Sequence, residues 1–66
     1  MFVRLMIQEA GEEFRATLSQ RDDESKAAVS EPETFVVKTK DEAKRRARAM
    51  ARELGLATFR VIDKAQ

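Results

Sequence analysis

The sequence predicts an α+β fold in the order β-β-β-α-β, with a four-stranded, mainly antiparallel sheet and one helix packed on one face. Two patterns lead to this prediction. Four short segments alternate apolar and polar residues, which is typical of half-buried strands, and residues 40–54 repeat their apolar side chains at helical spacing. The length of 66 residues allows one domain, 1–66, with a small core.

The first two strands are expected at residues 2–8 and 13–19. The short connection between them contains Gly11, which favours a hairpin. Every second residue of each strand is apolar, so one side of the hairpin should face the helix. The residues expected on that side are Val3, Leu5, Ile7, Phe14, Ala16 and Leu18.

Residues 20–32 are expected to form a flexible loop. The segment is polar, is acidic at its start, shows no period and ends at Pro32. Loops of this length are uncommon in compact domains and are usually functional or disordered. Two alternatives remain open: the second strand extends into the segment, or the segment becomes ordered on a partner.

Two further strands are expected at residues 33–38 and 57–62, because both segments are rich in β-branched and aromatic residues. A polar tail, residues 63–66, follows the last strand. The residues of these strands that should face the helix are Phe35, Val37, Ala57, Phe59 and Val61.

The helix has clear start and stop signals. Thr39 and Glu42 have the spacing of a capping box, and Gly55 suits the left-handed position that follows a helix. Leu56 is then expected to pack back on the last turn. The side of the helix that should cover the sheet carries Ala43, Ala47, Met50, Ala51 and Leu54.

The composition argues against several kinds of site. Without cysteine or histidine, the chain can form no disulfide and no thiolate or imidazole zinc site. Tyrosine and tryptophan are also absent, and two glycines do not make a phosphate-binding loop. The acidic residues at 22–24 lack the spacing of a calcium loop. We therefore expect a protein that is not an enzyme, with no metal, no cofactor and no small-molecule substrate.

The charges are unevenly distributed. Residues 1–33 carry four basic and eight acidic side chains, whereas residues 34–66 carry nine and four. Such a dipolar molecule can associate with itself or bind an anion. Because a core this small is marginal alone, we expect a homodimer. There is no run of 18 apolar residues and no signal peptide, so we expect no membrane association and a cytoplasmic location.

The outer side of the helix is a candidate surface for nucleic acid. Lys44, Arg48 and Arg52 follow one another at intervals of four residues with no acid in their row. Their spacing of roughly 6 Å along the axis is comparable to that of phosphates along a strand. The alternative is a solvated surface with acids supplied by other parts of the fold. The candidate nucleic-acid-binding residues are Lys40, Lys44, Arg45, Arg48 and Arg52.

The side of the sheet without a helix is a candidate protein interface. Interfaces are enriched in aromatic residues, methionine and arginine, and all three occur on this side. The alternative is that Phe2 and Met6 fold over an edge, which would leave only a small apolar patch. The candidate interface residues are Phe2, Arg4, Met6, Val36, Arg60 and Ile62.

Residues 35–63 follow the pattern F-x-V-K-T-K-D-E-A-K-x-x-A-x-x-x-A-x-x-x-G and then a strand that ends Val61-Ile62-Asp63. This pattern resembles a family of short uncharacterised bacterial domains, in which strands precede a helix that opens T-K-x-E-A and one strand follows it. The front half of the chain departs from the family. The resemblance implies a fold and no activity.

The start of the helix is also similar to the last helix of double-stranded RNA-binding domains, whose pattern is close to S-K-K-E-A-K-x-x-A-A. Asp41 stands where that pattern has a lysine, and Arg48 stands where it has an alanine. The leading helix of that fold is missing, and here a strand follows the helix. The matching residues are Thr39, Lys40, Glu42, Ala43, Lys44 and Ala47.

We therefore interpret the protein as a small non-catalytic interaction module, a bacterial or phage-type regulator or inhibitor that acts by contact with another protein or with itself. The alternative is a nucleic-acid-binding accessory protein that places its basic helix side on phosphates.

Overall fold

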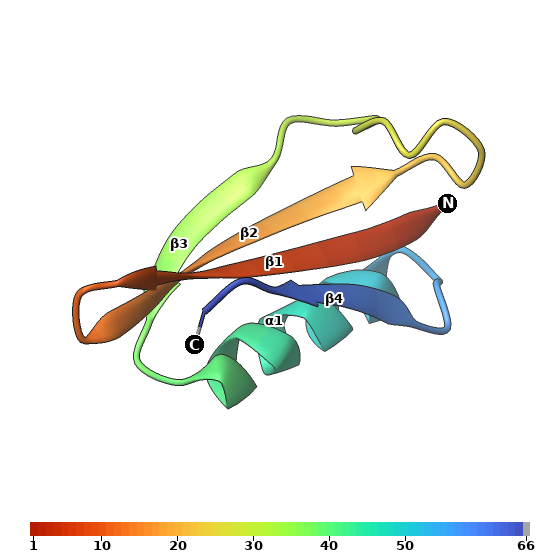
Figure 1. Ribbon diagram of the computed structural model, residues 1–66. Coiled ribbons are helices and arrows are strands. Elements are labelled where there is room, and N and C mark those ends of the chain that lie inside the picture. Colours follow the sequence, from red (N-terminus) through yellow and green to blue (C-terminus); the bar gives the residue numbers. More distant parts are fainter. Residues whose placement is uncertain (66) are drawn as a thin grey trace.

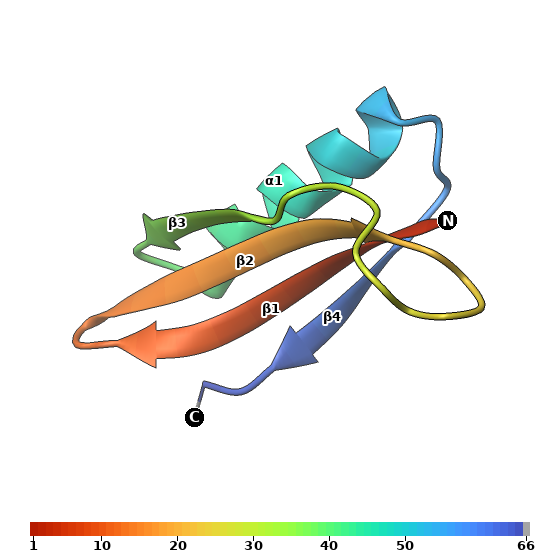
Figure 2. The same ribbon diagram turned by 90° about the horizontal axis from the view of Figure 1, so that it is seen from above.

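The strands and the helix occur in the predicted order. The computed structural model describes residues 1–65. Its elements are β1 (Phe2–Ala10), β2 (Glu13–Arg21), β3 (Glu33–Val37), α1 (Lys40–Glu53) and β4 (Phe59–Asp63). The strand order in the sheet is β3-β2-β1-β4, and α1 lies across one face (Figure 1 and Figure 2).

The sheet is mixed rather than purely antiparallel. β2 is antiparallel to both β1 and β3, whereas β4 runs parallel to β1. β3 and β4 therefore point the same way at opposite edges, and such a pair needs a crossover, which α1 provides. The helix begins after Thr39, whose hydroxyl accepts the Glu42 N–H at 3.2 Å, as the capping pattern predicts.

The core lies between α1 and the sheet. Val3, Leu5 and Ile7 have no exposed surface, and neither have Ala43 and Ala47 on the helix. Alanine side chains let the helix approach the strands closely, so that larger residues can fill the margins of the core. The residues partly buried at these margins are Phe14, Phe35, Met50, Leu56 and Phe59. The prediction that three of the four phenylalanines face the helix is confirmed.

The C-terminal end of α1 closes as a Schellman motif. Gly55 has φ +73°, its N–H donates to the Arg52 carbonyl at 3.1 Å, and the Leu56 N–H donates to the Ala51 carbonyl at 2.8 Å. After this reversal of the chain, Leu56 packs against the core. The expectation that Leu54 is buried is wrong, because this C-cap residue is 41% exposed.

The C-terminal strand and tail differ from the prediction in three ways. β4 begins later than expected, and Ala57 is exposed. Val61 lies on the covered side but is 40% exposed, because α1 packs chiefly on β1. The tail is not wholly free, since Ala65 joins the core and the Lys64 N–H donates to the Ile7 carbonyl at 2.8 Å.

Residues 20–32 begin as strand. β2 continues to Arg21, so the alternative in which the second strand extends into this segment is confirmed at its start. Three contacts then fold the segment back on β2: Asp22 N–H to Ala27 C=O (3.0 Å), Val29 N–H to Gln20 C=O (2.9 Å) and a bridge between Arg21 and Ala28. The flexibility of the segment stays a prediction.

Candidate functional site

The side of the sheet opposite α1, here called the open face, is built from every second residue of the four strands. The register places Arg4 opposite Ser19 and beside Arg60. In the next row, Met6 lies opposite Thr17 and beside Ile62. The open face comprises Phe2, Arg4, Met6, Gln8, Arg15, Thr17, Ser19, Arg21, Thr34, Val36, Arg60 and Ile62.

The open face is strongly basic. Four of its side chains are arginines, and the only carboxylate on the same side of the strands, that of Glu13, lies at the hairpin end. Within residues 1–65, no ion pair joins any of these arginines to a carboxylate. The eight acids of the first half lie in the loops or near the ends of the strands, whereas three of its four bases lie on the open face.

Two of these arginines are held close together. Arg21 Nε donates to Ser19 Oγ at 3.0 Å, and Arg21 Nη1 donates to the Lys26 carbonyl at 2.8 Å. Partial burial lowers the pKa of Arg4 below its usual value, and the positive charge of Arg21 lowers it further. This pair of like charges favours the approach of an anionic group.

Phe2 is the main correction to the predicted interface. Its ring lies on the open face but is only 7% exposed, so the expectation of an exposed aromatic anchor is wrong. The Arg60 guanidinium carbon lies 4.0 Å from the ring centroid, and Lys26 Nζ lies 5.6 Å from it. Cations over an aromatic face are attracted by its quadrupole, so these two side chains cover the ring.

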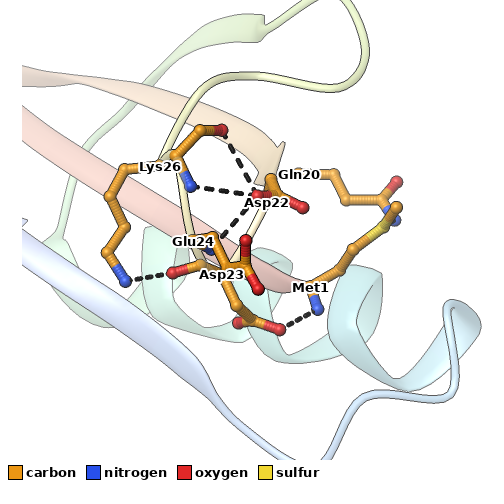
Figure 3. Close-up of polar contacts among 7 residues, drawn as sticks. Met1, Gln20, Asp22, Asp23, Glu24 and Lys26 are labelled. Carbon is orange, nitrogen blue, oxygen red and sulfur yellow. Dashed lines mark hydrogen bonds and ion pairs between the residues drawn. The ribbon is translucent and has the colours of Figure 1, made fainter.

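The turn that brings Lys26 over Phe2 is fixed by its own polar contacts (Figure 3). The Asp23 carboxylate accepts from the amino group of Met1, and Lys26 Nζ donates to the Asp23 carbonyl. The Asp22 carboxylate accepts the N–H groups of Glu24 (3.1 Å) and Ser25 (3.0 Å). These backbone hydrogen bonds hold the pKa of Asp22 below its ordinary value.

The accessible apolar residues of the open face lie beyond this covered end. Val36 is 54% exposed, Ile62 is 36% exposed and Met6 is half-buried. Arg15 lies directly opposite Val36 and is exposed. The open face therefore combines scattered apolar side chains with arginines. The sequence pattern already placed Arg15 on this side of the sheet, and Arg21 is added to it by the structure.

Of the candidate nucleic-acid-binding residues on α1, Lys40 is engaged within the fold. Lys40 Nζ lies 2.8 Å from the Asp63 carboxylate and 5.6 Å from the Phe14 ring centroid. The hydrogen bond from Lys40 is the main reason that the pKa of Asp63 lies below its ordinary value, and the charge of Lys44 contributes. For Lys40, the alternative of an acid supplied by another part of the fold is confirmed.

Lys44 is half-buried, and the three remaining candidates on α1 are exposed. Arg45, Arg48 and Arg52 are exposed and form no ion pair with any residue from 1 to 65. The Arg48 guanidinium carbon lies 5.9 Å from the centroid of the Phe59 ring, at the start of β4. The structure thus separates two basic surfaces, one on α1 and one on the open face, with the apolar core between them.

A cleft of about 490 Å³ lies between the C-terminal half of α1 and the start of β4. Its apolar lining is Ala51, Leu56, Ala57 and Phe59, and its polar lining is Arg48, Arg52 and Thr58. The sequence did not reveal this cleft, because it depends on how far α1 extends over β4. The only signal was the basic row itself.

Acidic side chains are not gathered for metal binding in the part of the chain that the structure describes. No group of three histidine, cysteine, aspartate or glutamate residues there could hold a metal ion. The absence of catalytic activity stays a prediction.

Comparisons with known proteins do not indicate a function for the chain. No helix within residues 1–65 is long and apolar enough to cross a bilayer. The resemblances of residues 35–63 to bacterial domains and of α1 to RNA-binding domains stay predictions. No family model, curated protein or solved structure matched the chain.

Proposed function

We propose that the protein is a non-catalytic interaction module whose open face binds an acidic surface of another protein. The observation that carries this proposal is the set of four arginines on one sheet face with no carboxylate paired to them within the described chain. Complementary potentials steer binding and select partners. The exposed Val36 and Ile62 supply apolar contact beside the arginines.

The arginines of the open face also bear on whether its partner is a second copy of the chain or a different protein. In a two-fold dimer through the open face, the surface would meet itself. Arg15, Arg60 and their neighbours would then face other arginines, which costs free energy. The geometry therefore favours an acidic partner over a second copy on this face. The homodimer stays a prediction, and light scattering is the measurement that checks it.

The proposal is tested by capturing partners from a nuclease-treated cell extract with wild type and with single charge reversals. Arg15→Glu is the test variant, because this side chain is exposed on the open face and forms no ion pair with any residue from 1 to 65. Arg45→Glu is the matched control on the outer side of α1. The captured protein is then purified and its affinity is measured with each variant.

We expect an acidic partner whose affinity falls by about tenfold or more with Arg15→Glu and changes little with Arg45→Glu. The affinity should also fall as salt rises, since exposed charges are screened. A partner that binds both variants equally well would sink the proposal, and so would a failure of any captured protein to bind once purified.

Nucleic-acid binding through α1 is the second candidate, and it is supported by the exposed Arg45, Arg48 and Arg52. Phosphate contacts give affinity without sequence reading and weaken steeply with salt. A labelled duplex titrated at low salt should bind wild type and lose affinity with each of Arg45→Glu, Arg48→Glu and Arg52→Glu. Absence of binding at low salt would exclude this candidate.

A further inference from the structure

The outer edge of β4 is open to another strand. Within residues 1–65, β4 pairs only with β1, and the Lys64 N–H donates to the Ile7 carbonyl on that inner side. Backbone groups of successive residues point to opposite sides of a strand, so those of Val61 and Asp63 point away from β1. An edge of this kind is a template for an added strand.

Space for the side chains of such a strand exists beside α1. Val61 lies on the covered side of the sheet, in register with Leu5, yet it is 40% exposed. The cleft between α1 and the start of β4 continues this opening, with half-buried Phe59 and Leu56 in its lining. An added strand would cover these apolar groups.

The surroundings of this edge are cationic. Arg48 and Arg52 line the cleft, and Lys44 lies close enough to lower the pKa of Asp63. Arg60 adds a further positive charge on the opposite side of β4, on the open face. The one carboxylate of β4, that of Asp63, is engaged by Lys40 on α1.

The opposite edge of the sheet differs in charge. β3 begins with Glu33, directly after Pro32, and the groove between β3 and α1 is lined by Glu33 and Glu53 as well as by Arg46. Proline is one of the features that protect an edge from pairing. The β4 edge has no proline, so it is the better candidate for strand addition.

The charges also select the occupant. If β4 paired with β4 of a second copy, the two helices would bring Lys44, Arg48 and Arg52 toward the same residues of the other copy across the joined sheet. An acidic segment would meet these cations with complementary charge. We propose that the outer edge of β4 and the adjoining cleft bind an extended segment of a partner protein that contains both acidic and apolar residues and adds to the sheet as a fifth strand.

This site adjoins the open face at Arg60, lies otherwise on α1 and the edge of β4, and is tested with a defined probe. A display library of random linear peptides about ten residues long, which is the upper range of strand lengths, is selected on the full chain. The selected peptides should be enriched in aspartate or glutamate together with apolar residues. One of them is synthesised, and its affinity is measured by calorimetry.

Two variants test the geometry of the complex. Arg48→Glu should weaken the peptide by about tenfold or more, while the controls Arg45→Glu and Arg15→Glu should change its affinity by less than about twofold. Val61→Pro removes the N–H that points outward, without removing a hydrogen bond to β1, and should abolish binding. Val61→Thr keeps that N–H and should bind. In the wild-type complex, hydrogen exchange at Val61 should slow by about tenfold or more.

Several results would overturn the proposal. They are a selection without enrichment in acidic residues, equal binding to wild type and Arg48→Glu, or unchanged exchange at Val61 in the complex. Self-association that Val61→Pro abolishes would identify a second copy as the occupant instead. Because Arg15→Glu serves here as a control, failure of this site and failure of the open-face proposal are distinguishable.

Discussion

The two faces of the sheet are made by alternate residues of the same strands, yet one face is buried and apolar and the other is partly exposed and basic. On the covered face, Val3, Leu5 and Ile7 are fully buried beneath a helix surface of alanines. On the open face, Arg4 and Met6, the residues between them, remain partly exposed. The difference teaches that the fold depends mainly on one face, so the other can hold an excess of positive charge without disrupting the core.

The largest difference between the two faces is expected for substitutions at two adjacent residues of β1. Leu5→Ala should lower the free energy of unfolding by about 2–5 kcal/mol, because it leaves a cavity in the closed core. Met6→Ala, at a half-buried position of the open face, should cost less than about 1 kcal/mol. Urea unfolding measures both. Equal losses would show that the open face is packed as tightly as the core.

A second test uses two alanines of α1. Ala47 has no exposed surface, so Ala47→Leu should force the helix away from the sheet and cost about 1–3 kcal/mol. Ala49 is exposed, and Ala49→Leu should change stability by less than about 0.5 kcal/mol. Thermal unfolding compares the two. A neutral Ala47→Leu would mean that the helix does not lie as close to the strands as the buried alanines indicate.

A smaller effect concerns the carboxylate that joins β4 to α1. The pKa of Asp63 is lowered in the folded state, so its contribution to stability is complete above its unfolded pKa of about 4 and is lost as the pH falls through the lower folded value. Asp63→Asn should therefore be less stable than wild type at neutral pH, and the difference should shrink in acid. A difference that is constant with pH would contradict this account.

Sequence periodicity was sufficient to predict the covered face. The alternation at Val3, Leu5 and Ile7 and the capping signals at Thr39 and Gly55 are local, and the structure confirms them. Register follows from the same alternation, because a slip of one residue would turn every side chain to the other face. Local patterns therefore fixed which residues of the strands reach the core.

The open face could be predicted only in part, because its environment depends on distant segments. Phe2 was expected to be exposed, but the turn at residues 22–26 brings Lys26 over its ring. Lys40 was a candidate for nucleic-acid binding, but Asp63 reaches it from β4, as the alternative of an acid from another part of the fold allowed. No periodic pattern in the sequence signals either contact. The cleft beside β4 was missed for the same reason, since it depends on the position of α1 over the sheet.

The most direct test of the central claim is a map of the binding surface by NMR, with isotope-labelled protein and the purified partner. The account predicts that amide signals of Arg4, Met6, Thr17 and Arg60 shift on binding, while those of Arg45 and Ala49 on the outer side of α1 do not. Shifts confined to α1, with an undisturbed open face, would contradict it.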